Sequence, residues 1–221
     1  MNVVYCFDKK YVELAIKSIN SLLANKSEKD IINLYLIVTP DVEKNIKFCK
    51  EVNLVYIEYT PDKNLYISGH ITGMAYTRLF IAELIPQIDR CIYLDCDTII
   101  YKSLKELWEI DVNDYFYGAK INKHFIFSGI LLINLEQIRK HEYIKKYKEY
   151  ILNHKIIEFH DCTILNEFHR NNTKKITNKY NDRFLNKETV IHHTHEYNNV
   201  LNFNVIKRQY EYLSSKSIRN R

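Results

Sequence analysis

The segment Arg90–Trp108, RCIYLDCDTIIYKSLKELW, places two carboxylates between two short apolar runs. Cys91–Leu94 has the composition of a buried strand end, and Thr98–Ile100 resumes as a strand. Ser103 is predicted to be the N-cap of a short helix over Leu104–Trp108. The two carboxylates are therefore expected at the carboxyl end of a buried strand, where open α/β sheets bind ligands.

These carboxylates belong to Asp95 and Asp97, one residue apart. Residues i and i+2 of a straight strand share a face, so both side chains could converge on one point. Neighbouring carboxylates raise each other's pKa unless a cation lies between them. A hard divalent cation prefers oxygen ligands, which makes the pair a candidate metal site. A solvated surface turn is the alternative, and the flanking apolar runs favour the metal site.

Composition restricts the class of protein. The chain has 221 residues, fits one domain and is 46% hydrophobic, while 4 Gly and 3 Pro argue against disordered and fibrous classes. A net charge of +5 is too mild to indicate nucleic acid as a partner, but it suits an anionic ligand. We expect one domain over residues 1–204 and a basic tail over 205–221, which could make a weak contact with an acidic membrane surface.

The cysteines indicate neither zinc nor a disulfide framework, because they are odd in number, scattered and without a CxxC pair. They are Cys6, Cys49, Cys91, Cys96 and Cys162. Reduced thiols favour a cytoplasmic location. The N-terminal residues predict a strand rather than a signal peptide, and we expect no transmembrane helix.

The first sixty residues alternate between predicted strands and helices. Strands are expected over Val3–Phe7, Ile31–Val38 and Leu54–Tyr59, and apolar residues recur at helical spacing from Val12 to Leu23. Thr39-Pro40 predicts the start of a second helix. Its inward residues would be Val42, Ile46 and Cys49. A β-α-β-α-β order implies parallel strands with right-handed crossovers.

Further helices and strands follow residue 60, which keeps the chain in the α/β class. Helices are predicted over Met74–Ile85, where Pro86 ends the helix, Leu135–Leu152 and Asp161–Phe168. Strands are predicted over Tyr115–Ile121, Ile130–Asn134 and Thr189–Ile191.

Three histidines, His192, His193 and His195, follow the last predicted strand. If the strand continues, His192 and Thr194 face one way, whereas His193 and His195 face the other. At most one or two of them can therefore reach a single metal ion. Imidazole is a common ligand for Mn, Fe and Zn. An exposed polar turn is the alternative.

Two further polar residues stand in predicted helices. Arg78 interrupts an apolar helix, and a buried guanidinium needs a carboxylate or phosphate partner. Arg78 is therefore expected in a structural salt bridge or in a ligand site, and both hold if its partner is a central aspartate. Asp161 opens the helix Asp161–Phe168 and is either its N-cap or a ligand contact.

Several segments, in order, resemble glycosyltransferase family 8, the retaining sugar transferases that include bacterial lipooligosaccharide galactosyltransferases and glycogenin. They are Val4–Tyr11 with its Asp-x-x-Tyr turn, AYTRL at 75–79, IYLDCD at 92–97 with Leu104–Trp108, GILLINL at 129–135, DCTILN at 161–166, and Val190–His192. Together they span residues 2–200.

The resemblance implies a GT-A fold, in which a nucleotide-binding α/β sheet abuts a smaller second sheet. It implies Mn²⁺, with Mg²⁺ as the alternative, held by Asp95, Asp97 and His192. It also implies that Asp8 and Tyr11 bind the uracil end of a UDP-sugar, with the backbone of Cys6 against the base.

The resemblance also assigns residues to the rest of the donor. Arg78 and His70 would approach the phosphates or the sugar, and Asp161 would hydrogen-bond the transferred sugar. Arg78 and Asp161 are therefore the catalytic candidates. The other expected substrate-binding positions are Cys96, Ser128 and Cys162.

The chain departs from the family pattern at four places. Phe127-Ser128-Gly129 stands where the family has Asn-Ala-Gly, and Cys162 stands where it has Gln. His195-Glu196-Tyr197-Asn198 replaces the family's Gly-Pro-x-Lys-Pro-Trp. The loop that covers the acceptor in the family is shortened here to about Asn122–Phe125. The family's specificity for sugar and acceptor therefore cannot be carried over to this chain.

The leading prediction is metal-dependent, retaining transfer of a hexose or related sugar from a UDP-sugar to a hydroxyl acceptor such as a glycan. A buried thiol at Cys162 should be unreactive, which predicts front-face attack without a covalent enzyme intermediate. The alternatives are a sugar-nucleotide-binding protein without transfer activity and a metal-dependent nucleotidyltransferase. The latter would show a Gly-rich phosphate loop, whereas the turn 8–11 has no glycine.

Overall fold

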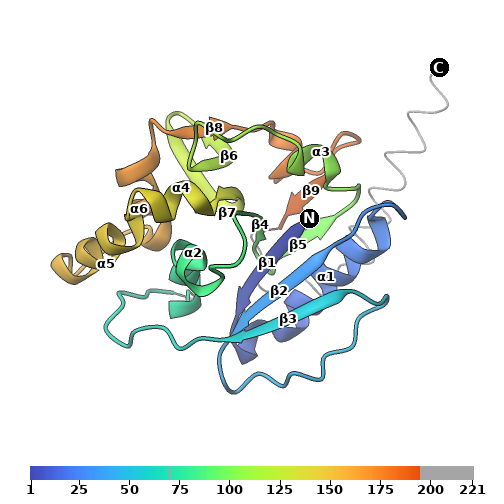
Figure 1. Cartoon of the computed structure of the whole chain (residues 1–221), viewed down its shortest axis with the longest axis horizontal. Coiled ribbons are helices and arrows are strands. Elements are labelled where there is room, and N and C mark those ends of the chain that lie inside the picture. The colour runs from blue at the N-terminus through green and yellow to red at the C-terminus, as the bar shows by residue number, and fades with distance from the viewer. Residues whose placement is uncertain (70, 195–221) are drawn as a thin grey trace.

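A seven-stranded sheet forms the centre of the computed structural model, which describes residues 1–69 and 71–194 (Figure 1). Its strand order is β3-β2-β1-β4-β7-β6-β8, and β5 and β9 form a separate two-stranded sheet. The strands are β1 Asn2–Phe7, β2 Asn33–Val38, β3 Asn53–Glu58, β4 Arg90–Leu94, β5 Thr98–Ile100, β6 Tyr117–Asn122, β7 Phe125–Asn134, β8 Thr173–Lys175 and β9 Ile191–His193.

Helices cover both faces of the central sheet (Figure 1). The α-helices are α1 Val12–Asn25, α2 Ile81–Leu84, α3 Lys105–Trp108, α4 Leu135–Lys140, α5 Tyr143–Asn153 and α6 His160–His169. Short 3₁₀ helices span Lys9–Tyr11, Gly73–Leu79 and Asn178–Tyr180. One buried apolar cluster packs α1 and α3 against the sheet, and a second packs α2, α4, α5 and α6 against the other face.

The sheet is mostly parallel, which confirms the predicted α/β class with a small second sheet. Strands β3, β2, β1 and β4 run parallel, whereas β7 runs antiparallel to both β4 and β6. The chain moves outward from β1 to β3 and then crosses back to β4 on the other side of β1. The carboxyl ends of β1 and β4 therefore flank the point where the strand order reverses, which is where open α/β sheets bind ligands.

The helix predicted after Thr39-Pro40 is wrong, because residues 39–52 form an irregular connection. Val42 is buried and Ile46 is partly buried against the first apolar cluster, as the apolar spacing suggested, but Cys49 is exposed. The backbone N–H of Cys49 donates to Asn20 Oδ1 at 2.9 Å. Contacts with α1 therefore hold this segment without a helix of its own.

Two predicted helices differ from the observed ones. The helix expected over 135–152 is divided into α4 and α5 at Glu142, which has a left-handed φ of 53°. The break lets the rings of His141 and Tyr143 both pack against Phe116, with centroids 5.4 and 4.7 Å away. The helix expected over 74–85 is instead a 3₁₀ helix, Gly73–Leu79, followed by α2.

The last strand lies later than predicted, at Ile191–His193 instead of 189–191. Its register with β5 pairs Thr98 with His193 and Ile99 with His192. The predicted boundary at residue 204, the basic tail 205–221 and His70 lie outside the described residues. None of the helices in the described ranges combines the length and the apolar composition needed to cross a membrane.

Candidate active site

A cavity of about 490 Å³ opens at the carboxyl ends of β1 and β4, a volume typical of small-molecule sites. Most of the residues predicted from the sequence line it. They are Cys6, Tyr11, Arg78, Asp95, Cys96, Asp97, Ser128, Asp161 and Cys162. Segments far apart in the sequence therefore meet where the topology places a ligand.

Asp95 and Asp97 lie in a tight turn between β4 and β5, not in the straight strand that the sequence suggested. The backbone of this turn is held from several sides. Asp95 N donates to Gly129 O at 2.8 Å, and the Thr98 hydroxyl donates to Asp95 O at 2.8 Å. The Thr194 hydroxyl donates to Asp97 O at 3.0 Å. These contacts fix the directions in which the two carboxylates point.

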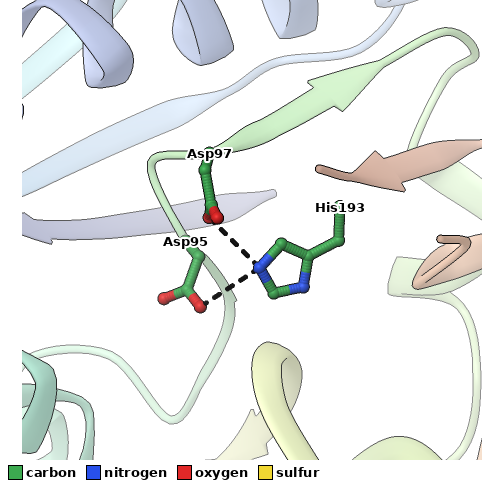
Figure 2. Close-up of side chains that lie close together, drawn as sticks. All are labelled: Asp95, Asp97 and His193. Atoms are coloured by element: carbon green, nitrogen blue, oxygen red, sulfur yellow. Dashed lines mark ion pairs between the residues drawn. The ribbon is translucent and has the colours of Figure 1, made fainter. Parts of the chain in front are cut away.

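The third member of this group is His193 (Figure 2). Its Nε2 lies 3.1 Å from Asp97 Oδ1 and 3.6 Å from Asp95 Oδ2. His192, which was predicted to join the pair, instead places Nδ1 2.9 Å from the backbone oxygen of Asp182. Neighbouring residues of a strand face opposite sides, so only one of the two histidines can face the carboxylates, and the register of β9 pairs His193 with Thr98 and His192 with Ile99.

The three side chains fit a divalent metal ion. One ligand atom from each of Asp95, Asp97 and His193 lies within 4.8 Å of the others, and oxygen and imidazole ligands suit Mn²⁺. Burial raises the pKa of Asp95, although Arg78 and His193 oppose that shift. Burial alone would lower the pKa of His193, but the carboxylates of Asp97 and Asp95 raise it. Positive charge between these carboxylates is therefore stabilised.

Gly129, in β7, makes room for the His193 ring. A Cβ added at this glycine would lie 2.1 Å from His193 Cε1 and 2.8 Å from Asp95 Oδ2. Both distances are far below any real Cβ contact. A side chain at position 129 and the observed arrangement of the histidine and the carboxylate are therefore mutually exclusive.

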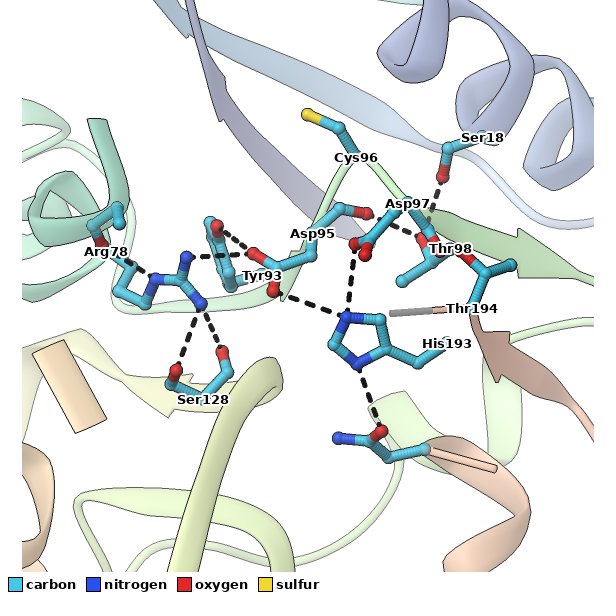
Figure 3. Close-up of polar contacts among 12 residues, drawn as sticks. Ser18, Arg78, Tyr93, Asp95, Cys96, Asp97, Thr98, Ser128, His193 and Thr194 are labelled. Atoms are coloured by element: carbon cyan, nitrogen blue, oxygen red, sulfur yellow. Dashed lines mark hydrogen bonds and ion pairs between the residues drawn. The ribbon is translucent and has the colours of Figure 1, made fainter. Parts of the chain in front are cut away.

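Arg78 lies between Asp95 and Ser128 (Figure 3), and it also contacts the carboxylate of Asp161. Its Nη2 lies 2.9 Å from Asp95 Oδ1, and its Nε lies 3.2 Å from Asp161 Oδ2. Nη1 donates to the Ser128 backbone oxygen at 2.9 Å, and the guanidinium carbon lies 4.6 Å from the centroid of the Tyr93 ring. The expectation of a central aspartate as the partner of Arg78 is confirmed.

Asp161 is buried, with 5% of the residue exposed, in the first turn of α6. Phe159, not Asp161, is the N-cap of this helix, so capping does not explain the carboxylate. Its Oδ2 faces Arg78 but has no hydrogen-bond partner within the described part of the chain. A buried acceptor of this kind favours a ligand that donates a hydrogen bond.

Cys162 lies beside Asp161 on the cavity wall, with Sγ 2.9 Å from the Ser128 hydroxyl. Burial, with the charge of Asp161, raises the pKa of this thiol to about 12. The raised pKa supports the prediction of an unreactive thiol, because the thiolate is the nucleophilic form.

Asp8 lies outside the lining of the cavity, and its Oδ1 accepts a hydrogen bond from Lys10 N at 3.0 Å. Sequence reasoning did not single out Tyr93, whose hydroxyl donates to Asp95 Oδ1 at 2.6 Å. The signal was available, since Tyr93 stands two residues before Asp95, near the end of β4.

Three phenylalanines at the rim, Phe125, Phe127 and Phe159, were also missed. The Phe125 ring lies edge-on to both others, with centroids 5.4 and 5.9 Å away. They come from β7 and from the start of α6, so no local sequence pattern brings them together.

Two relatives match most of this chain. General stress protein A of Bacillus subtilis is 29% identical over 195 residues, covering 75% of this chain and 68% of that protein. Glycosyltransferase GlyF of Streptococcus pneumoniae is 26% identical over 193 residues, covering 81% of this chain and 48% of that protein. The chain thus spans between about half and two thirds of these relatives' lengths.

Among solved structures, the galactosyltransferase LgtC in complex with donor and acceptor sugar analogs is similar, with a TM-score of 0.79. The match covers 98% of this chain and 96% of that one at 20% sequence identity, and it confirms the GT-A fold. The model of glycosyl transferase family 8 matches residues 2–208, and the chain therefore belongs to that family.

Proposed function

We propose that the protein is a metal-dependent, retaining glycosyltransferase that moves a hexose or related sugar from a UDP-sugar to a hydroxyl acceptor such as a glycan. The observation that carries this proposal is the bridge made by Arg78. It joins Asp95, one of the candidate metal ligands, to Asp161, whose buried oxygen lacks a hydrogen-bond donor. One cavity thus contains a cation site and an acceptor for a sugar hydroxyl.

Asp95, Asp97 and His193 would hold the ion, with Mn²⁺ proposed and Mg²⁺ as the alternative. When bound, such an ion acts as a Lewis acid that stabilises the charge of a leaving diphosphate. Arg78 adds a fixed positive charge beside it. The pKa of this guanidinium is raised well above its usual value, because Asp161 and Asp95 outweigh the opposing effect of burial.

Asp161 would orient the transferred sugar by accepting a hydrogen bond at Oδ2. Cys162 would line the sugar subsite without reacting, because its thiol stays protonated at neutral pH. This supports front-face attack by the acceptor hydroxyl with retention of configuration and no covalent enzyme intermediate. Tyr11 and Cys6, which also line the cavity, would face the base.

The test is a screen of several UDP-sugars with Mn²⁺, read as UDP release with and without a glycan acceptor. Acceptor-dependent release that requires Mn²⁺ supports transfer, and the anomeric configuration of the product, read by NMR, tests retention. Tight UDP-sugar binding without release would indicate a binding protein. Pyrophosphate release from UTP and a sugar phosphate would indicate a nucleotidyltransferase.

A cytoplasmic location of the protein and a contact of its basic tail with a membrane surface remain predictions.

A further inference from the structure

The histidine at the candidate metal site has two ring nitrogens with different surroundings. His193 Nε2 faces the carboxylates of Asp97 and Asp95 at 3.1 and 3.6 Å. A neutral imidazole binds a metal through its unprotonated nitrogen, so binding through Nε2 requires the proton on Nδ1. That proton in turn needs an acceptor, because a buried donor without a partner destabilises the protein.

Asn181 stands at the position where this acceptor is needed. Its Oδ1 lies 3.2 Å from His193 Nδ1, and only 2% of the residue is exposed. With Oδ1 accepting the proton of Nδ1, Nε2 is the ring nitrogen that would bind a metal ion held by the carboxylates. The opposite orientation of the amide would place an N–H₂ group against Nδ1, move the ring proton to Nε2 and block the metal side.

The backbone around Asn181 is itself fixed. Asn181 N donates to Asn178 O at 3.0 Å, and Lys120 Nζ donates to Asn181 O at 2.8 Å. The next residue, Asp182, accepts a hydrogen bond from His193 N at 2.9 Å through its own backbone oxygen. The segment at 181–182 therefore holds the histidine at two points, the main chain and the ring.

We propose that Asn181 is a positioning residue for the metal site, an uncharged acceptor that fixes the tautomer and the orientation of His193. The proposal rests on the metal role proposed above for His193. The amide oxygen holds a proton on Nδ1, so that Nε2 is the nitrogen that can bind a metal ion. Within the described residues, Asn181 Nδ2 has no hydrogen-bond partner. The side chain of Asn181 is therefore held by the contact between its Oδ1 and the His193 ring.

The experiment measures Mn²⁺ affinity of the full chain by calorimetry without any sugar donor, at pH 8. Asn181→Leu keeps the size of the side chain but removes the acceptor, and we expect it to weaken Mn²⁺ binding by about 10–100-fold. Asn181→Asp restores an acceptor and should bind within a few-fold of the wild type. Asn178→Leu, at an exposed position in the same 3₁₀ turn, is the matched control and should leave the affinity unchanged.

Nitrogen-15 NMR of the metal-free wild type supplies a second readout that does not depend on folding of a variant. We expect Nδ1 of His193 to carry a proton in the wild type and in Asn181→Asp, and to lose it in Asn181→Leu, where the remaining ring proton stays on Nε2 facing Asp97. An unprotonated Nδ1 in the wild type, or Mn²⁺ binding by a folded Asn181→Leu within twofold of the wild type, would overturn the inference. Failure of the wild type itself to bind Mn²⁺ would instead overturn the metal role in the proposed function, and this inference with it.

Discussion

Replacing Gly129 by alanine is the sharpest test of the site geometry. The new Cβ would lie 2.1 Å from His193 Cε1 and 2.6 Å from Nδ1, whereas real Cβ atoms essentially never come closer than 3.0 Å to a neighbour. The ring must therefore move by at least 3.0 − 2.1 = 0.9 Å. A metal–ligand distance tolerates about 0.2 Å, so a shift of this size removes the histidine from the ligand set.

Two magnitudes follow for Gly129→Ala. Mn²⁺ affinity should fall by at least about 10–100-fold. A loss of this size is typical when only a residue that hydrogen-bonds to a metal ligand is mutated, and here the ligand itself is displaced. The metal-free protein should lose about 1–3 kcal/mol of unfolding free energy, because the added methyl overpacks a buried site. Calorimetry with Mn²⁺ and urea unfolding monitored by circular dichroism measure the two effects.

Gly118→Ala is the matched control, since Gly118 lies in the neighbouring strand β6 of the same sheet. Its added Cβ would meet Leu132, Ile176 and Val112 at 3.3–3.4 Å, so adjustments of a few tenths of an ångström suffice. It should keep Mn²⁺ affinity. If Gly129→Ala bound Mn²⁺ as tightly as this control, the ring of His193 could not lie where the structure places it.

Four further outcomes are expected. Asp97→Asn should abolish Mn²⁺-dependent UDP-sugar turnover in the donor screen, and near-normal turnover would contradict the metal assignment. Arg78→Met should cost about 3–5 kcal/mol of unfolding free energy in urea, because it leaves the buried carboxylate of Asp161 without its ion-pair partner, and a loss below about 1 kcal/mol would be inconsistent with the bridge. Asp161→Ala should reduce turnover by about a hundredfold or more while Cys162→Ser keeps substantial activity, and a glycosylated form of either residue found by mass spectrometry would refute front-face attack. Burial lowers the pKa of His169 from 6.5 to about 3, so the unfolded chain takes up a proton that the folded protein excludes, and stability should fall as the pH drops through this window. His169→Gln should flatten that fall by about 1.4 kcal/mol per pH unit between pH 6 and 4, and an unchanged slope in urea unfolding would contradict the burial of a neutral imidazole.

The first five strands were predictable because each is a short apolar run, whereas β8 was not predicted and β7 begins at Phe125 instead of the predicted Ile130. Val3–Phe7 and Cys91–Leu94 were found to within one residue of the observed β1 and β4. The α/β order and the parallel first sheet followed from them. Helices were predicted less well, because helical spacing is a local signal that tertiary contacts override. Asn20 capping the backbone of Cys49 and the packing of His141 and Tyr143 on Phe116 are contacts of this kind.

Site residues were predictable where they belong to a sequence motif within or directly beside a predicted strand or helix. Asp95, Asp97, Arg78 and Asp161 all reach the cavity for this reason. His193 was not chosen, because neighbouring histidines face opposite sides of a strand, and the register of β9 against β5 that decides between them is a tertiary contact. Gly129 was named only as part of a motif, since its role depends on a ring contributed by a segment 64 residues later, 193 − 129.

The hairpin between β6 and β7 turns through only Lys123 and His124, both with left-handed φ values of 46° and 68°. Such a two-residue turn is too short to place further residues over Phe125 and Phe127, which line the cavity. Hairpin tips tolerate insertion better than strands do. A longer loop grafted between Asn122 and Phe125 would therefore add contacts to an incoming acceptor while leaving the metal and donor side unchanged, which makes this turn the natural place to redesign acceptor choice.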